Sequence, residues 1–226
     1  MNKDQLYADL RKQILTLVLE PGSALDEHSL SEKYEISRTP LREVLRKLAG
    51  EGYVEIVSNR GASVSSMSHR VLRDFFITAP MLYAAVGRLA AQNARPQQIE
   101  SMKMAQWHFR EASEKSDAEE MVYWNDRFHS VMGDMADNPY LTPSYNRLLI
   151  DHARISQTFY RLRNKEMAER VDTAADHHDK MIEAIENGES QHMVDLIVLH
   201  WELSHELMEY FVRPDPLPVT EIASQI

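Results

Sequence analysis

The residues after Ser68 constrain the fold most, because their apolar side chains recur at helical spacing almost without interruption. Short breaks divide this stretch at residues that start or end helices: Arg95-Pro96, Ser116-Asp117 with Glu119 in position to complete a capping box, Asn138-Pro139, the neighbourhood of Asn164, and Asn187-Gly188. Short connections make successive helices antiparallel, so residues 67–213 are predicted to form a bundle of about six helices. Prolines at 214, 216 and 218 predict that residues 214–226 form a tail without regular structure.

The first 66 residues follow another pattern, in which helical segments precede β-prone ones. Apolar residues at helical spacing predict three helices, over residues 4–18, 27–34 and 38–49, with Ser37 as the N-cap of the third. Two β-prone runs, residues 53–57 and 62–64, flank the turn signal Ser58-Asn59-Arg60-Gly61. Three helices and a hairpin are typical of a winged helix-turn-helix domain, which we predict over residues 1–66 of a mainly α-helical protein.

Composition excludes several kinds of site. The chain contains no cysteine, which excludes disulfides, thiolate zinc sites and cysteine nucleophiles, and it lacks the common glycine-rich phosphate loops. No apolar run approaches the roughly 18 residues that span a bilayer, and the first residues carry no signal-peptide core. We therefore expect a soluble, cytoplasmic protein without a membrane partner.

The formal net charge of −10 is unevenly distributed along the chain. Residues 1–66 hold nine Lys and Arg against ten Asp and Glu, whereas residues 67–226 hold sixteen against twenty-five. A nearly neutral N-terminal part can still present a basic face, so the acidic total does not exclude nucleic acid as its partner.

The third predicted helix begins with a cluster of groups suited to DNA. Arg38 and Arg42 are four residues apart and share a face, and a guanidinium matches the O6 and N7 acceptors of guanine. The hydroxyls of Ser37 and Thr39, together with the amides of the first turn, suit phosphate. Further cations follow at Arg46, Lys47 and, in the hairpin turn, Arg60. The alternative is an exposed helix whose charges are merely solvated.

Two segments resemble the DNA-binding domain of the GntR family of bacterial transcription regulators: Leu25-Asp26-Glu27-His28-Ser29-Leu30 and Ser37-Arg38-Thr39-Pro40-Leu41-Arg42-Glu43-Val44-Leu45-Arg46-Lys47-Leu48. The helical remainder resembles the ligand-sensing (FCD-type) domain of the family's FadR branch. This resemblance implies a transcription regulator, expected to be a repressor, that binds as a homodimer to a near-palindromic DNA operator. It also implies which residues contact the operator: His28, Ser37, Arg38, Thr39, Arg42, and Arg60 with Gly61 in the wing.

Histidine is concentrated in the helical part, where eight of the ten lie beyond residue 100. Asn125 and His129 are four residues apart on one predicted helix and therefore face the same way. His177-His178 begins another helical stretch, and His200 lies in the last long helix. Three imidazoles and one amide oxygen from three helices can bind a divalent metal and leave positions open. The alternative is that each is an ordinary surface or core histidine.

The family resemblance favours the metal site, with zinc or nickel as the expected ion. It selects these ligands: Asn125, His129, His178 and His200. An ion with open positions can bind a small carboxylate effector directly. The chain departs from the family in its first sensor helix, where Ala79 and Tyr83 stand in place of an arginine and a glutamate. The candidate effector-binding residues are Tyr83, Arg154 and Tyr160.

Together these features predict a regulator rather than an enzyme, with its DNA affinity controlled by a small molecule bound at or near the metal. Two alternatives stay open. One is a metal-dependent hydrolase, which is disfavoured because no carboxylate is evidently placed beside the ligands as a general base. The other is a regulator whose metal only ties the helices together.

Overall fold

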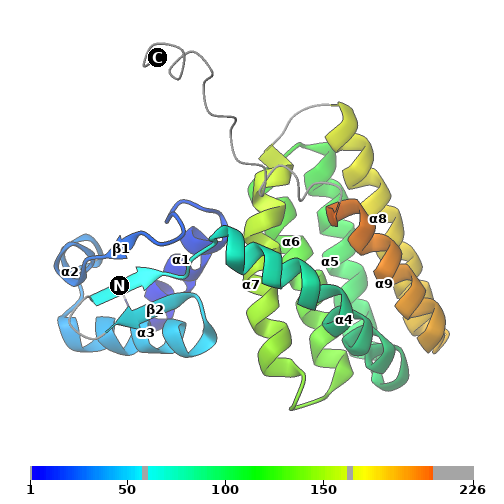
Figure 1. Cartoon of the computed structure of the whole chain (residues 1–226), viewed down its shortest axis with the longest axis horizontal. Helices are drawn as coiled ribbons and strands as arrows, with labels where there is room; N and C mark the ends of the chain where they lie inside the picture. The colour runs from blue at the N-terminus through cyan, green and yellow to red at the C-terminus, as the bar shows by residue number, and fades with distance from the viewer. Residues whose placement is uncertain (1, 58–60, 162–164, 206–226) are drawn as a thin grey trace, which may run out of the picture.

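A computed structural model describes residues 2–57, 61–161 and 165–205 (Figure 1). The predicted wing residue Arg60 and the predicted tail, residues 214–226, lie outside the described residues. The described chain is mainly α-helical with one small sheet, which confirms the predicted fold class. No helix within these ranges is both long and apolar enough to cross a bilayer.

The N-terminal part is built from three helices and a small antiparallel sheet, coloured blue to cyan in Figure 1. Its elements are α1 (Lys3–Leu15), β1 (Ala24–Leu25), α2 (Glu27–Tyr34), α3 (Arg38–Glu51), β2 (Val54–Val57) and β3 (Gly61–Val64). The strands lie in the order β1-β3-β2, so the predicted hairpin is the β2–β3 pair. Strand β1 was not predicted, because two residues are too short to show a strand period.

Helix α3 ends in a backbone conformation that favours glycine. Gly52 follows the helix with a φ of 94°, in the left-handed region that glycine adopts without strain. A β-carbon at this position would also collide with the side chain of Arg147. The helix runs to Glu51, two residues beyond its predicted end at Ala49, and a larger residue at position 52 would be strained by this backbone conformation.

The C-terminal part consists of long helices, coloured green to orange in Figure 1. They are α4 (His69–Asn93), α5 (Pro96–Glu114), α6 (Ala118–Ala136), α7 (Thr142–Arg161), α8 (Lys165–Glu186) and α9 (Ser190–His205). The predicted breaks at Arg95-Pro96, Ser116-Asp117, Asn138-Pro139 and Asn187-Gly188 fall between two of these helices, and the predicted break at Asn164 lies outside the described residues. One cap differs from the prediction: the Asp117 side chain accepts the bond from the Glu120 amide, while Ser116 has a left-handed φ of 53°.

The two parts of the chain share apolar contacts along α6 and α7. Val122 of α6, with Ile150 and Ala153 of α7, belongs to the same buried cluster as the core of the N-terminal part. Other residues of α6 and α7, among them Phe128 and Ile155, lie in the core of the helical bundle. These two helices therefore contact the N-terminal part on one side and the bundle interior on the other.

Candidate functional site

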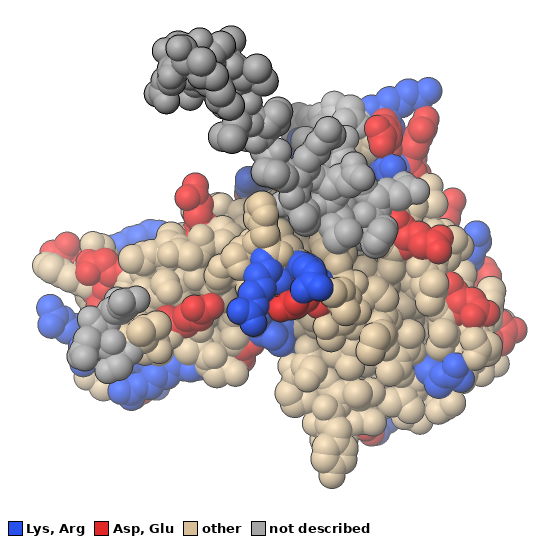
Figure 2. Space-filling view, viewed as in Figure 1, with Lys and Arg blue, Asp and Glu red and all other residues tan. Residues whose placement is uncertain are grey.

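The first turn of α3 presents polar side chains to solvent above a buried apolar face. Leu41, Val44, Leu45 and Leu48 of this helix are buried in the N-terminal core. On the outward face, the predicted DNA-contacting residues are all exposed: Ser37, Arg38, Thr39, Arg42, Arg46 and Lys47. Ser37 is the N-cap by position, but its side chain makes no capping hydrogen bond, so its hydroxyl is not committed to the helix. Figure 2 shows Lys and Arg side chains along one edge of the N-terminal part.

Several of these cations contact acidic or aromatic neighbours within the N-terminal part. The Arg42 Nε lies 2.8 Å from a carboxylate oxygen of Glu27, and the Lys47 ammonium lies 3.8 Å from the centre of the Tyr7 ring. His28 on α2 is exposed beside Glu32, and Gly61 is exposed at the start of β3. No described residue forms a hydrogen bond or ion pair with Arg38, so its guanidinium can bind another molecule without breaking a contact.

Replacing Glu27 with glutamine is expected to strengthen operator binding, because Arg42 no longer has to leave a carboxylate to reach DNA. Exposed ion pairs contribute up to about 1 kcal/mol, so affinity is expected to rise by about two- to fivefold. Titration of a labelled operator measures the change. Glu35→Gln, at an exposed position just after α2, alters the net charge equally but leaves the Arg42 pair intact; equal gains from both variants would contradict a specific role for Glu27.

Three histidines from three helices meet inside the bundle. His129 on α6, His178 on α8 and His200 on α9 are buried, and their candidate ligand nitrogens lie within 4.8 Å of one another. Asn125, four residues before His129, is buried on the same face of α6. The structure thus brings together the predicted metal-binding residues, and His177, the neighbour of His178, stays outside the three-histidine group.

Polar atoms of this cluster are buried without partners, as expected where a bound group supplies the missing bonds. Within the described residues, no hydrogen bond satisfies Asn125 Nδ2, either ring nitrogen of His129, Nε2 of His178 or Nδ1 of His200. Burial lowers the pKa of His200 to about 3, and burial followed by the neighbouring histidines lowers the pKa of His129 and His178. The rings are therefore neutral near pH 7 and offer lone pairs to a metal, so the residues fit a divalent ion such as zinc or nickel.

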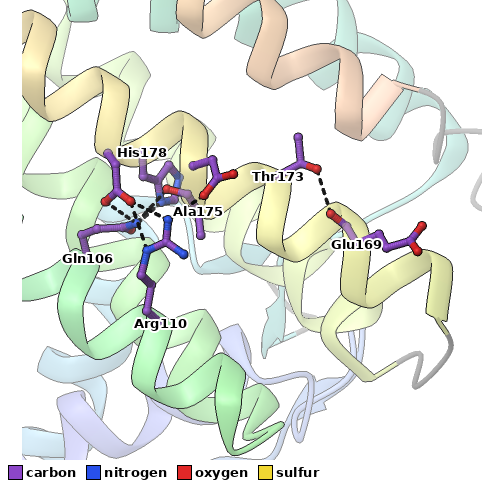
Figure 3. A network of polar contacts seen from close by, with 8 residues as sticks. Gln106, Arg110, Glu169, Thr173, Ala175 and His178 are labelled. Atoms are coloured by element: carbon purple, nitrogen blue, oxygen red, sulfur yellow. Dashed lines mark hydrogen bonds and ion pairs between the residues drawn. The ribbon is translucent and has the colours of Figure 1, made fainter.

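A second layer of side chains orients His178 (Figure 3). Its Nδ1 lies 3.0 Å from the amide oxygen of Gln106 on α5, and the Gln106 nitrogen donates to the backbone oxygen of Ala175 and to Asp179. Arg110 pairs with Asp179 on the outer side of this network. Because the Gln106 oxygen accepts, Nδ1 of His178 carries the proton and Nε2 is left as the ligand nitrogen. Such support fixes ring orientation at metal sites.

A small cavity of about 50 Å³ adjoins the histidine cluster. Among its described lining residues are six with polar groups: Asn125, His152, Ser156, Tyr160, Arg170 and His200. His152 and Arg170 were not predicted from the sequence. The polar stripe His152 and Ser156, four residues apart on α7, was the signal that could have revealed this wall.

The three predicted effector-binding residues occupy different places. Tyr160 lines the cavity. Tyr83 is buried behind it, with its hydroxyl 2.8 Å from Nδ1 of His152. Arg154 is not among the cavity's lining residues; its guanidinium is fully buried and donates to the backbone oxygen of Ser65, 2.8 Å away. The prediction for Arg154 is therefore corrected: its position on α7 turns it toward the N-terminal part.

Hydrogen bonds and an ion pair join the two parts of the chain beside the helices that carry the candidate metal-binding residues. Arg154 pairs with Asp151 on α7, the residue next to His152. Arg11 of α1 donates one hydrogen bond to Asp126, the residue next to Asn125, and another to the hydroxyl of Tyr53. Both donor–acceptor distances are 2.7 Å. Thus α6 and α7 carry cavity residues and contacts to the N-terminal part at adjacent positions.

Comparison with known proteins assigns both parts of the chain. Residues 2–64 match the model of bacterial regulatory proteins of the gntR family, and residues 81–203 match the FCD domain. The HTH-type transcriptional repressor RspR of Escherichia coli is 29% identical over 133 residues, which cover 59% of this chain and 58% of that repressor. The chain thus spans little more than half the length of this relative.

Two further proteins agree with this assignment. The gluconate operon transcriptional repressor of Bacillus subtilis is 24% identical over 187 residues, covering 82% of this chain and 76% of the relative. The solved structure of E. coli McbR/YncC has the same fold, with a TM-score of 0.76 and 20% identity, covering 92% of this chain and 97% of the other. Two matched domains in this order show that the chain belongs to the GntR family of bacterial regulatory proteins and carries an FCD domain.

Proposed function

We propose that this chain regulates transcription by binding a DNA operator through the first turn of α3 and the wing. The exposed cluster of Ser37, Arg38, Thr39 and Arg42 carries the proposal. It joins guanidinium groups, hydroxyls and a helix N-terminus on a rigid helix, the combination that binds base edges and phosphates in the major groove. Two relatives, RspR and the gluconate operon transcriptional repressor, are named as repressors, which supports repression as the effect of operator binding.

The operator is expected to be near-palindromic and to bind two copies of the chain. Each copy presents one α3, and a homodimer with two-fold symmetry places two such helices on half-sites about one helical turn of DNA apart. His28, Arg46, Lys47 and Gly61 are the remaining described residues that we assign to this contact.

The FCD domain is proposed to bind a small carboxylate beside a divalent metal held by Asn125, His129, His178 and His200. When bound, such an ion supplies an electrophilic centre with positions open to an oxygen ligand. The small cavity beside these residues supports the proposal, because it leaves space for an oxygen group of a ligand next to the ion. An effector releases DNA only if it binds the DNA-incompetent arrangement more tightly than the competent one.

The hydrolase alternative loses its support. The relatives are transcriptional regulators, and no Asp or Glu is found among the described residues that line the cavity. A hydrolytic metal site needs a group that takes the proton from water, and carboxylates most often fill this role.

Selection of binding sequences from a random pool of DNA duplexes tests the DNA part of the proposal. The full-length chain is expected to enrich an inverted repeat. Enrichment of no sequence, with the same salt-dependent binding to every duplex, would contradict sequence-specific regulation.

His178→Ala is expected to lower zinc affinity by at least about 100-fold. Removing the hydrogen-bond partner of a metal ligand lowers metal affinity about 10- to 100-fold, and removing the ligand itself should lower it further. Gln106→Leu removes that support and is expected to fall in this lower range. Competition with a chromophoric chelator measures both. His177→Ala is the matched control and should bind zinc normally; an equal loss in His177→Ala and His178→Ala would contradict the assigned ligand set.

A further inference from the structure

We infer that the ion pair between Arg11 of α1 and Asp126 of α6 holds α3 in one orientation relative to the helical bundle, and thereby restricts the operator to one spacing of its half-sites. Arg11 and Asp126 act here as positioning residues that do not touch DNA. The inference rests on the proposed binding of two copies to a near-palindromic operator. It also requires that the two copies contact each other through their helical bundles.

Arg11 connects the end of α3 to the bundle. Its Nε donates to the Tyr53 hydroxyl and its Nη2 to a carboxylate oxygen of Asp126, each with a donor–acceptor distance of 2.7 Å. Tyr53 is buried and follows Glu51, the last residue of α3, by two positions. The hydroxyl of Tyr7, also on α1, donates to Glu51 at a distance of 2.6 Å. Because one rigid guanidinium binds both Tyr53 and Asp126, it fixes the distance between the end of α3 and α6.

The Arg11–Asp126 pair is largely shielded from water, which makes its separation unfavourable. The Asp126 side chain is 9% exposed, and among the described residues Arg11 is the one that binds its carboxylate. Separating the two side chains would leave a buried charge without a partner. A second pair, Lys12 with Glu119, joins the same two helices at 3.4 Å, but these side chains are 62% and 51% exposed. Water solvates those two charges when they part, so this pair restrains the orientation little.

Open space adjoins the Arg11–Asp126 pair, so close side-chain packing does not fix the orientation there. One cavity of about 440 Å³ lies between α1 and α6, and another of about 490 Å³ lies between the end of α3 and residues of α6 and α7. Both cavities are lined by Arg11 and Asp126. Three bundle residues, Val122, Ile150 and Ala153, share the apolar core of the N-terminal part, and apolar contacts have no preferred direction. The directional bonds of Arg11 therefore determine the orientation on this side.

Contacts to α7 provide the other point of attachment. Arg154 donates to the backbone oxygen of Ser65 at 2.8 Å, and Arg161 donates to the backbone oxygen of Thr16 at 2.9 Å. Both donors lie on the same helix, so they hold the N-terminal part to α7 but leave rotation about the axis of α7 open. The Arg11–Asp126 pair lies on a second helix, α6, and a contact on a second helix prevents this rotation.

The orientation of α3 determines half-site spacing because DNA is itself helical. One turn of the duplex comprises about 10–10.5 base pairs over about 34–36 Å, so each added base pair displaces a half-site by about 3.4 Å and turns it by about 35°. Two α3 helices in a fixed orientation therefore match one spacing. Two α3 helices that rotate about α7 could follow the half-sites to neighbouring spacings.

The first test measures the orientation without DNA. The chain has no cysteine, so spin labels can be attached at Glu32→Cys on α2 and Glu100→Cys on α5, both at exposed positions. Labelled full-length protein, diluted into unlabelled protein, is expected to give one narrow distance in pulsed electron paramagnetic resonance. The further substitution Asp126→Asn is expected to broaden this distance. A broad distribution with Asp126 present, or an equally narrow one in Asp126→Asn, would overturn the inference.

The second test measures the spacing preference of the full-length chain. The probes are duplexes in which the selected half-sites are moved together or apart by one and two base pairs. The wild type is expected to bind the best spacing at least about tenfold more tightly than either neighbouring spacing, and Asp126→Asn less than about threefold more tightly. Affinity for a duplex with a single half-site should change by less than about twofold, because no residue of α3 is altered.

Matched variants separate orientation from charge and from stability. Glu119→Gln changes the net charge as Asp126→Asn does and breaks the exposed pair between the same two helices, so it should keep the spacing preference. Arg11→Met removes the buried pair without altering α6 and should lose the preference. The double variant Arg11→Met/Asp126→Leu leaves neither charge unpaired, so it should recover stability but not the spacing preference.

Three results of the spacing measurement would each overturn the inference: a wild-type preference in either Asp126→Asn or Arg11→Met, an equal loss in Glu119→Gln, or recovery of the preference in the double variant. Failure of the proposed function has a different signature. If selection enriches no sequence, sequence-specific regulation is contradicted, while the spin-label distances still test the orientation by themselves.

Discussion

Metal-free protein is expected to lose about 4 kcal/mol of its free energy of unfolding between pH 7.5 and pH 5, because His152 and His200 are buried as neutral rings with pKa values of about 4 and about 3. In the unfolded chain both rings titrate near the ordinary histidine pKa of about 6.5. Below that pH the unfolded state binds protons that the folded state does not, so stability falls as the pH falls. Burial also lowers the pKa of His129 and His178, which adds to the loss.

Chemical denaturation of chelator-treated protein across this pH range measures the effect. His152→Gln removes one of these groups and should make the pH dependence about 2 kcal/mol shallower. His192→Gln, at an exposed histidine of α9, should leave it unchanged. Zinc holds its ligands deprotonated, so the loaded protein should resist acid until the metal is released. A stability independent of pH in the metal-free protein would contradict the buried neutral cluster.

Arg154→Met is expected to destabilise the folded protein by about 3 kcal/mol, since removing one member of a buried ion pair leaves the other charge and its neighbours unsatisfied. The Arg154 side chain is fully buried, donates to the Ser65 backbone oxygen and pairs with Asp151. Asp151 keeps a second partner in Arg147, 2.8 Å away, which places the loss at the lower end of the range for buried pairs.

Urea denaturation measures this loss, and operator binding in the absence of urea measures its effect on the DNA-contact part. The double variant Arg154→Met/Asp151→Leu removes both charges and should recover most of the stability. Arg95→Met breaks an exposed pair with Asp137 and should change stability by less than about 1 kcal/mol. Equal stability of Arg154→Met and the wild type would show that this contact does not fasten the N-terminal part to α7.

The winged helix-turn-helix could be predicted because each of its elements has a local signal. Leu41, Val44, Leu45 and Leu48 mark one face of α3, and all four are buried. Local signals were misleading where two neighbouring residues could both act as a cap: Asp117 caps α6, although Ser116 has the better spacing to Glu119. Strand β1 forms only through pairing with β3, which is distant in sequence, and a two-residue strand has no sequence pattern from which this pairing could be predicted.

The candidate ligand site could be predicted only in part. The four-residue spacing of Asn125 and His129 predicts that they share a helix face, whereas His178 and His200 were selected through family resemblance. His152 was missed because α7 is buried around most of its circumference. Asp151, His152 and Arg154 lie within four positions of one another, and all three are buried although they face different partners. Periodicity distinguishes a buried face from an exposed one, but it does not separate two buried faces with different partners.

Operator binding by Arg38→Ala tests the central claim most directly, with the selected operator and a set in which each base pair is replaced in turn. Loss of a bidentate guanine contact should weaken binding to the best operator by about 5- to 150-fold and abolish the preference for one guanine in each half-site. Arg88→Ala, which removes an exposed guanidinium from α4, should bind like the wild type. An Arg38→Ala variant with unchanged affinity and base preference would contradict the account that α3 recognises the operator.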